Sequence, residues 1–165
     1  LLMKPGKLTS AEFTVMQRHT TIGAQLLAQC THPAFRLAEQ IALCHHEKWD
    51  GTGYPKGLKG ENIPEAARIA TLADVYDALT HARAYKHAWT HDESVMEIER
   101  MSGTHFEPRV VKAFVKLITN LRLEHGDALD DYLAKAGEDS TFIQARDKMQ
   151  TMLSEMESLD PGELL

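Results

Sequence analysis

The chain has 165 residues, 43% of them hydrophobic and 25% charged, so it can bury the core of one ordinary globular domain without disulfide bonds. Its formal net charge of -6 argues against broad nucleic-acid binding, which needs a cationic surface, and DNA is not an expected partner. No apolar run approaches a membrane span, no signal peptide precedes the first motif, and the two cysteines follow no disulfide pattern, so we expect a cytoplasmic protein whose present segment makes no membrane contact.

Two helices are predicted before the first motif. A capping box at Thr9–Glu12 starts a helix that runs to about residue 29, with His19 on or near its apolar stripe. The second helix is predicted over residues 33–46, because Pro33 suits a first turn and apolar residues then recur at three and four positions. The residues expected to face the core are Phe13, Met16, Ile22, Leu26 and Leu27 in the first helix, and Phe35, Ala38, Ile41, Ala42 and His45 in the second.

Glycines and prolines predict a structured loop over residues 50–63, and Pro64 opens a third helix to about residue 83. Within this helix Asp74 and Asp77 lie three positions apart and share nearly one face. A buried aspartate on a helix is unfavourable unless it is paired or binds a metal, which makes Asp74 a candidate ligand. The expected buried stripe is Ile69, Leu72, Ala73, Tyr76 and Leu79.

The remaining elements are also predicted to be helical. A second capping box at Thr90–Glu93 starts a helix that ends near Gly103, and Pro108 opens another with Val111, Phe114, Val115 and Ile118 facing inward. Two further helices are expected over residues 128–136 and 140–159, the last with an apolar stripe that suits docking on the domain or on a partner helix. No strand-like alternation occurs, so the predicted fold class is all-α.

The most informative motif is the run from His45 to Asp50, followed by a glycine-rich loop that carries Tyr54. Imidazoles and carboxylates together suit iron, manganese, nickel or zinc. The neighbouring Cys44 has no CxxC partner, so a site of nitrogen and oxygen ligands is favoured over a thiolate site. Two adjacent histidines alone are more often solvated than metal-bound, and the downstream sequence decides between these alternatives.

Residues 45–88 read HHEKWDGTGYPKGLKGENIPEAARIATLADVYDALTHARAYKHA, a run that resembles the signature of the HD-GYP domain. This branch of the HD metal-dependent phosphohydrolases hydrolyses the bacterial second messenger cyclic di-GMP. The resemblance extends to residues 2–9, 16–19 and 103–108 and covers roughly residues 1–120. It implies an HD-superfamily helical domain with a structured GYP loop over residues 1–122. The apolar stripe of the tail, and not the resemblance, favours a helical C-terminal extension, residues 123–165, that packs on this domain.

The resemblance also implies a set of metal ligands. The family positions correspond to His19, His45, His46 and Asp74, which would hold two or three divalent ions, with iron or manganese favoured. Such ions polarise phosphoryl oxygens, lower the pKa of a bridging water and stabilise the leaving alkoxide. Glu47 and Asp50 are candidates to orient the ligating histidines from behind, and the alternative is that they are solvated loop charges.

Substrate and partner contacts follow from the same resemblance. Tyr54 is expected to stack on a guanine, while Arg83 and Lys86 are expected to pair with the phosphates of cyclic di-GMP. The loop segment Gly53, Tyr54 and Pro55 is expected to contact GGDEF-domain proteins, and a receiver or sensory domain is expected upstream. The predicted reaction is hydrolysis of cyclic di-GMP to the linear dinucleotide pGpG, to GMP or to both.

One departure from the family pattern bears on activity. In the family, the His-Asp pair that names the superfamily lies shortly before the KPGKLT segment. This chain begins at Leu1, directly before that segment, so the sequence given does not contain the pair. We therefore expect a fragment of a longer protein, with a natural degenerate domain as the alternative, and metal binding weaker than in the complete domain. No catalytic residue is predicted beyond the metal ligands.

Two other functions stay open at this point. One is a catalytically inactive module that senses cyclic di-GMP or docks on a GGDEF protein, and the other is an HD-type hydrolase for a different nucleotide, such as a mixed cyclic dinucleotide. Five further histidines receive no role and are expected at the surface: His81, His87, His91, His105 and His125.

Overall fold

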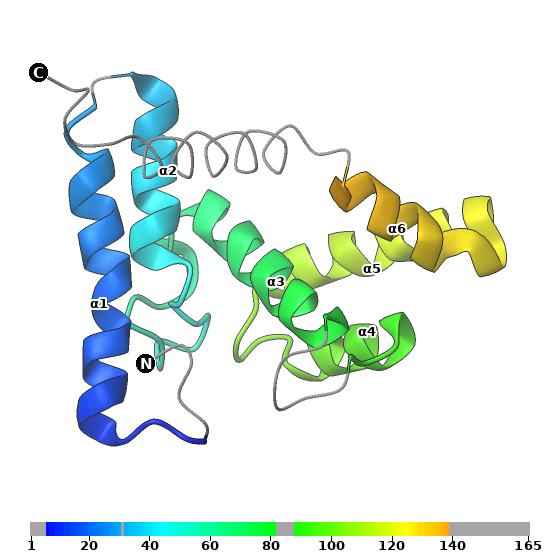
Figure 1. Ribbon diagram of the computed structural model, residues 1–165, viewed down its shortest axis with the longest axis horizontal. Helices are drawn as coiled ribbons and strands as arrows, with labels where there is room; N and C mark the ends of the chain where they lie inside the picture. The colour runs from blue at the N-terminus through cyan, green and yellow to red at the C-terminus, as the bar shows by residue number, and fades with distance from the viewer. Residues whose placement is uncertain (1–5, 31, 82–87, 139–165) are drawn as a thin grey trace, which may run out of the picture. The chain divides into compact units, whose positions relative to one another are not determined.

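The computed structural model describes residues 6–30, 32–81 and 88–138, and within these ranges every regular element is a helix (Figure 1). The elements are α1 (Ser10–Leu27), α2 (Pro33–Cys44), the 3-10 turn η1 (Gly60–Asn62), α3 (Glu65–Thr80), α4 (His91–Arg100), α5 (Pro108–His125), η2 (Gly126–Ala128) and α6 (Leu129–Glu138). The described β structure is limited to an isolated bridge between Ser102 and Phe106. The all-α prediction is therefore confirmed.

The chain divides into two compact units, Leu1–Lys116 and Leu117–Leu165, which are considered separately. The predicted helix over residues 140–159 lies outside the described residues, and the packing of a C-terminal extension on the domain stays a prediction. None of the helices in the described ranges is long and apolar enough to cross a membrane.

In the first unit α1 and α2 lie side by side and antiparallel (Figure 1). Both predicted capping boxes are present, with Thr9 and Glu12 at the start of α1 and Thr90 and Glu93 at the start of α4. These reciprocal hydrogen bonds satisfy backbone N–H groups that have no partner within the first turn of a helix. The starts of these two helices are thus explained by local sequence.

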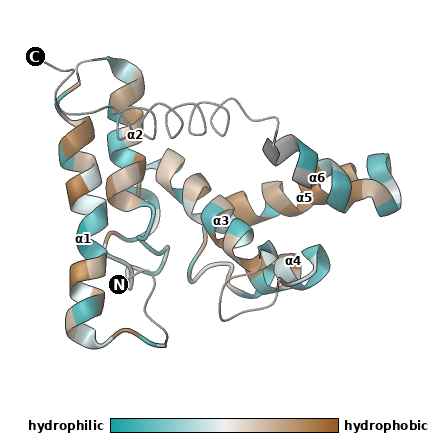
Figure 2. Ribbon diagram, viewed as in Figure 1, coloured by the Kyte–Doolittle hydropathy of each residue, from teal (hydrophilic) through white to brown (hydrophobic). Residues whose placement is uncertain are grey.

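The face of α1 that packs inward differs from the predicted stripe. Its buried residues are the small Thr20 and Ala24, whereas Ile22 and Leu26 are 47% and 65% exposed. A Cβ built on Gly23 would lie 3.6 Å from the Cβ of Ala42 in α2, so small side chains bring the two helices close together. Figure 2 shows hydrophobic segments recurring along α1.

A small apolar cluster attaches the end of α2 to the start of α3. Cys44, Ile63 and Ala67 are buried together, with Leu43 and Leu58 packed around them. The cluster fixes both ends of the loop between α2 and α3, because its members precede, end and follow that loop. Burial also raises the pKa of the Cys44 thiol, which marks it as a core residue.

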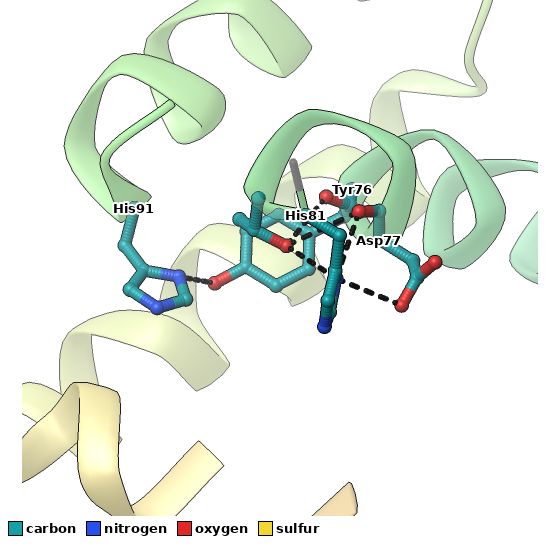
Figure 3. Close-up of polar contacts among 5 residues, drawn as sticks. Tyr76, Asp77, His81 and His91 are labelled. Atoms are coloured by element: carbon teal, nitrogen blue, oxygen red, sulfur yellow. Dashed lines mark hydrogen bonds and ion pairs between the residues drawn. The ribbon is translucent and has the colours of Figure 1, made fainter. Parts of the chain in front are cut away.

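The larger core cluster joins α3, α4 and the start of α5 through Leu72, Leu79, Ile98, Phe106 and Val111. Tyr76 of α3 contributes its ring, edge-on to Phe114, and its hydroxyl is hydrogen-bonded to Nδ1 of His91 at the start of α4 (Figure 3). The expected exposure of His91 is therefore wrong. At the end of α3, by contrast, His81 is exposed and contacts the exposed Asp77 (Figure 3).

The predicted stripe of α3 is only partly correct. Leu72 and Leu79 are buried and Tyr76 is half-buried, but Ile69 is 53% exposed and Ala73 is also exposed. Ala67 and Thr71 are buried instead, because the first half of α3 packs against the end of α2 rather than against α4. Among the described residues of the second unit, Ile118 and Leu129 are buried and His125 stacks on Tyr132.

Ile98 tests the larger cluster. Its side chain is fully buried, so Ile98→Ala should lower the free energy of unfolding by about 2–5 kcal/mol through lost burial and the cavity left behind. Met96 in the same helix is 63% exposed, and Met96→Ala should change stability by less than about 0.5 kcal/mol. Urea unfolding followed by circular dichroism measures both, and equal losses would contradict this core.

Candidate metal centre

Three of the four predicted ligands come together in the structure. His19 on α1 and His45 and His46 at the end of α2 each offer one ring nitrogen, and these atoms all lie within 4.8 Å of one another. The ring centroids are 4.1–5.2 Å apart. Because α1 and α2 pack closely through small residues, histidines 26 positions apart in the sequence share one space.

Backbone carbonyls orient two of these rings. Nδ1 of His19 lies 2.7 Å from the carbonyl oxygen of Met16, and Nδ1 of His45 lies 3.0 Å from the carbonyl oxygens of Ile41 and Ala42. A carbonyl oxygen can only accept a hydrogen bond, so each Nδ1 must carry the proton. In the neutral rings, both Nε2 atoms therefore present unprotonated lone pairs.

These two Nε2 atoms face each other at 3.2 Å. Two lone pairs at this distance repel unless a proton or a cation lies between them. Nitrogen ligands about 2.1 Å from a divalent ion are themselves about 3 Å apart, so the spacing suits two ligands of one ion. A carbonyl on the far nitrogen is also the usual outer contact of a metal-bound histidine, and the donor set fits a divalent metal.

The third ring is held neutral by its surroundings. Burial, together with His45 and His19, lowers the pKa of His46 from 6.5 to about 4, although Asp74 acts in the opposite direction. Desolvation disfavours the imidazolium, and two neighbouring imidazoles disfavour a third positive charge. His46 is thus unprotonated at neutral pH and has a nitrogen lone pair available.

Asp74, the fourth predicted ligand, lies outside the histidine group. It is exposed on α3, and none of its oxygens falls within the 4.8 Å set. Its carboxylate is close enough to act electrostatically on both rings: it opposes the lowering of the His46 pKa, and it adds to burial in raising the pKa of Tyr54. The structure thus places Asp74 beside the cluster but not in contact with it.

Glu47 has a different position from the one expected of a histidine-orienting carboxylate. It is 1% exposed, and its two oxygens accept hydrogen bonds from the backbone N–H groups of Lys56 (2.7 Å) and Leu58 (2.9 Å). It therefore closes the loop from inside, whereas backbone carbonyls orient His19 and His45. Its observed contacts close the loop, and the expected orienting role stays a prediction.

Asp50 is likewise a loop residue. Its Oδ1 accepts hydrogen bonds from the N–H (2.9 Å) and the hydroxyl (2.7 Å) of Thr52, which lower the pKa of its carboxyl group. This contact is a local turn of the kind that aspartate commonly makes. It orients no histidine among the described contacts.

Tyr54 covers the histidine cluster. Its ring stacks on His46 with centroids 4.8 Å apart, and Phe13 of α1 meets it edge-on at 5.8 Å. Its backbone N–H donates to the carbonyl of His46 at 3.1 Å. One face of this predicted guanine platform is therefore already occupied by a histidine.

Of the three GYP residues, only Pro55 is exposed, while Gly53 and Tyr54 are half-buried. A Cβ on Gly53 would lie 2.4 Å from the N of Lys48 and 2.5 Å from the Cα of Glu47, so this position excludes any side chain. The glycine is required because two backbone segments cross here. The other predicted substrate contacts, Arg83 and Lys86, lie outside the described residues.

Sequence reasoning missed His105, which was expected at the surface. It is half-buried on the turn before α5, stacks on Phe106, and has a pKa lowered by burial and Lys48 while Asp50 opposes the shift. Its charge also acts on His46. The signal available was its place in the GTHFEP segment, which the resemblance covered but to which no role was attached.

Comparison with known proteins places this geometry in a family. Residues 1–110 match the profile of the HD domain family. The chain belongs to the HD domain family. Members of this family are metal-dependent, which agrees with the histidine cluster but fixes neither the number nor the identity of the ions.

Relatives confirm the resemblance to the HD-GYP branch. A cyclic di-GMP phosphodiesterase of Vibrio cholerae is 55% identical over 120 residues, which cover 70% of this chain and 24% of the relative. A cyclic di-GMP phosphodiesterase of Thermotoga maritima is 47% identical over 117 residues, which cover 71% of this chain and 32% of the relative. A 3'3'-cGAMP-specific phosphodiesterase of Vibrio cholerae is 42% identical over 127 residues, which cover 77% of this chain and 23% of the relative. The chain spans about a quarter to a third of these relatives.

A solved structure supports the fold. The crystal structure of a cyclic GMP-AMP specific phosphodiesterase of Vibrio cholerae matches with a TM-score of 0.56 at 22% identity, covering 88% of this chain and 34% of the other. At this identity the likeness concerns the helical arrangement alone. It agrees with the HD fold expected from the sequence.

The backbone crossing at Gly53 gives a stability prediction. Gly53→Ala should lower the free energy of unfolding by about 1–3 kcal/mol, because the new methyl group meets backbone that cannot rotate away. Gly23→Ala is the control: its Cβ would make an ordinary 3.6 Å contact in a helix, and it should be neutral or stabilise by up to about 1 kcal/mol. Thermal unfolding of both variants measures the difference, and a neutral Gly53→Ala would refute the crossing.

The lowered pKa of His46 predicts a pH dependence of the metal-free protein. Since an unfolded histidine titrates near 6.5 and His46 near 4, the unfolded chain binds the extra proton first, and stability should fall as pH drops from 6.5 to 4. Above pH 6.5 this group should contribute no slope. Urea unfolding with chelator present tests this, and His46→Gln should flatten the decline; an NMR titration midpoint of His46 near 6.5 would contradict it.

Proposed function

We propose that this chain forms the metal- and nucleotide-binding part of an HD-GYP phosphodiesterase that hydrolyses cyclic di-GMP to pGpG, to GMP or to both. The observation that carries the proposal is the convergence of two carbonyl-oriented Nε2 lone pairs at 3.2 Å beside a third, neutral imidazole. A bound cation would attract both lone pairs, whereas in the metal-free fold they repel each other. The named relatives supply the substrate class.

In this proposal His19, His45 and His46 hold a divalent ion, and Asp74 completes the set from α3. Iron or manganese is favoured, and two or three ions are expected in the complete domain. When bound, such ions polarise the phosphoryl group and make water acidic enough to act as a nucleophile. The chain's own part is to present unprotonated nitrogens, which it does through the Nδ1 hydrogen bonds and the burial of His46.

Around the ions, Tyr54 limits the space above His46 and offers its outer face or edge to a guanine base. Burial and Asp74 raise the pKa of its hydroxyl, so it stays protonated and can donate a hydrogen bond to a phosphate or base oxygen. Arg83 and Lys86 are proposed to pair with the phosphates. Exposed Pro55 is the part of the GYP segment best placed for a GGDEF partner, and an upstream receiver or sensory domain is proposed to regulate the site.

A mixed cyclic dinucleotide is a second candidate substrate. Its support is the 42% identity to a relative named for 3'3'-cGAMP, over 77% of this chain. Both ligands carry two phosphodiesters and one or two guanines, so the metal-binding part serves either. The choice depends on base contacts, and a direct competition assay separates them.

The proposal predicts a histidine-dependent metal site. Titration of the chelator-treated chain with Mn(II), followed by electron paramagnetic resonance, should show binding of one ion per chain. His45→Ala should weaken it by more than about 100-fold, because loss of a direct ligand costs more than loss of a support behind a ligand, which costs about 10–100-fold. His81→Ala is the matched control, since His81 lies on an exposed helix end in contact with Asp77. Binding that is unaffected by His45→Ala would exclude this cluster as the site.

Hydrolysis is measured in the same samples. The chain is loaded anaerobically with Fe(II) or Mn(II) and incubated with cyclic di-GMP or 3'3'-cGAMP, and products are separated by chromatography. Release of pGpG or GMP that is lost in His45→Ala supports the phosphodiesterase. Metal-dependent binding of cyclic di-GMP without turnover supports instead the inactive sensing or docking module.

A further inference from the structure

The loop that follows the histidine pair is held by a buried ion pair that the proposed chemistry does not use. Arg68 of α3 pairs through Nη1 with Oε2 of Glu107, and the two side chains are 11% and 3% exposed. The Arg68 guanidinium also lies over the ring of Trp49, 5.8 Å from its centroid. One cation thus contacts both the metal-site loop and the turn before α5.

That turn grips the loop through its backbone. The N–H of Trp49 donates to the carbonyl of His105 at 3.0 Å, and the N–H of Asp50 donates to that of Thr104 at 2.8 Å. The Trp49 carbonyl in turn accepts from the N–H of Gly60 at 2.9 Å. Trp49 and Asp50 are therefore anchored by the turn before α5, from outside the loop.

Helix α3 grips the same segment from the other side. The Thr71 hydroxyl lies 2.9 Å from the carbonyl oxygen of His45, with the Ala67 carbonyl as a second acceptor at 2.7 Å. Segment 45–50 therefore bonds α3 at one end and the turn at the other. The Arg68–Glu107 pair joins α3 to the turn and closes a triangle of contacts around the histidine pair.

The pair is built for position more than for stability. Arg68 Nε is buried and has no acceptor among the described residues. An unpaired buried N–H group costs folding free energy, so the pair is not optimised for stability. Buried ion pairs contribute little net stability, because desolvation offsets their attraction. A planar guanidinium can pair edge-on with a carboxylate while its face covers an indole, which a lysine ammonium cannot do.

We propose that Arg68 and Glu107 are positioning residues that set the distance between the His45–His46 segment and α3, the helix that carries Asp74. Glu107 is suited to this part: it directly precedes α5, whose N-terminus favours a carboxylate, and its Oε1 also faces Arg109 Nε at 3.5 Å. Neither residue contacts a proposed ligand side chain. The inference deepens the proposed function and rests on it for the metal.

Arg68→Lys and Glu107→Gln are the test variants, both made in the whole chain. Binding of Mn(II) should weaken by about 10–100-fold in Arg68→Lys, the range found when supports behind metal ligands are removed. Adding Glu107→Gln to Arg68→Lys should cause little further loss, because the two residues act as one unit. Arg100→Lys is the matched control, because Arg100 pairs with Glu97 on the exposed side of α4. This variant should bind Mn(II) as tightly as the unaltered chain does.

A second control separates position from stability. Ile98→Val loosens the core cluster without touching the triangle, and it is compared at a temperature where it and Arg68→Lys are equally stable. Hydrogen exchange of residues 45–60, measured by mass spectrometry without metal, should be faster in Arg68→Lys than in Ile98→Val. Exchange in α1 should be the same in both.

Two results would overturn the inference: Mn(II) affinity in Arg68→Lys equal to that of the unaltered chain, or equal exchange over residues 45–60 in Arg68→Lys and Ile98→Val. If the unaltered chain bound no Mn(II) at all, the proposed function would fail instead. Hydrogen exchange would then decide alone whether the pair positions the segment.

Discussion

The site depends on one constraint: backbone carbonyls occupy the Nδ1 atoms of His19 and His45. A carbonyl cannot donate, so the tautomer of both rings is fixed by the helices that carry them, and both Nε2 lone pairs point into the same 3.2 Å gap. The two atoms lie this close because α1 and α2 pack through small residues, with Thr20 and Ala24 buried and Gly23 next to Ala42. The convergence of these nitrogens thus originates in helix packing.

The surrounding loop turns that local chemistry into a bounded site. Buried Glu47 closes the loop from inside, and Gly53 lets the backbone of the loop pass close to that of Glu47 and Lys48. The turn before α5 holds the start of the loop. Tyr54 is thereby laid on His46. The glycine and tyrosine of the GYP segment act first as parts of the site's wall, and only the proline faces outward. A partner that binds this loop would therefore act on the cover of the histidine cluster.

The sequence predicted what depends on local chemistry. Capping boxes at Thr9 and Thr90 and prolines near helix starts place the elements, whereas the resemblance to the HD-GYP family points to His19, His45 and His46 as the site. It failed for the inward face of α1, where Thr20 and Ala24 are buried instead of Ile22 and Leu26, because helical periodicity does not say which side a neighbour covers. The loop contacts of Glu47 could not be predicted either, because its partners, nine and eleven residues away, are brought to it only once the loop has closed.

The polar residues around the motif share a role that bears on mechanism. Glu47 and Asp50 are predicted to orient histidines, and their observed contacts hold backbone: Glu47 on Lys56 and Leu58, and Asp50 on Thr52. Thr71, which the sequence did not single out, holds the carbonyl of His45. A metal centre made of few ligands needs many such supports, since a displacement of an ångström separates nitrogens that must share one ion. The sequence run is long because it encodes both groups, and the histidines are its smaller part.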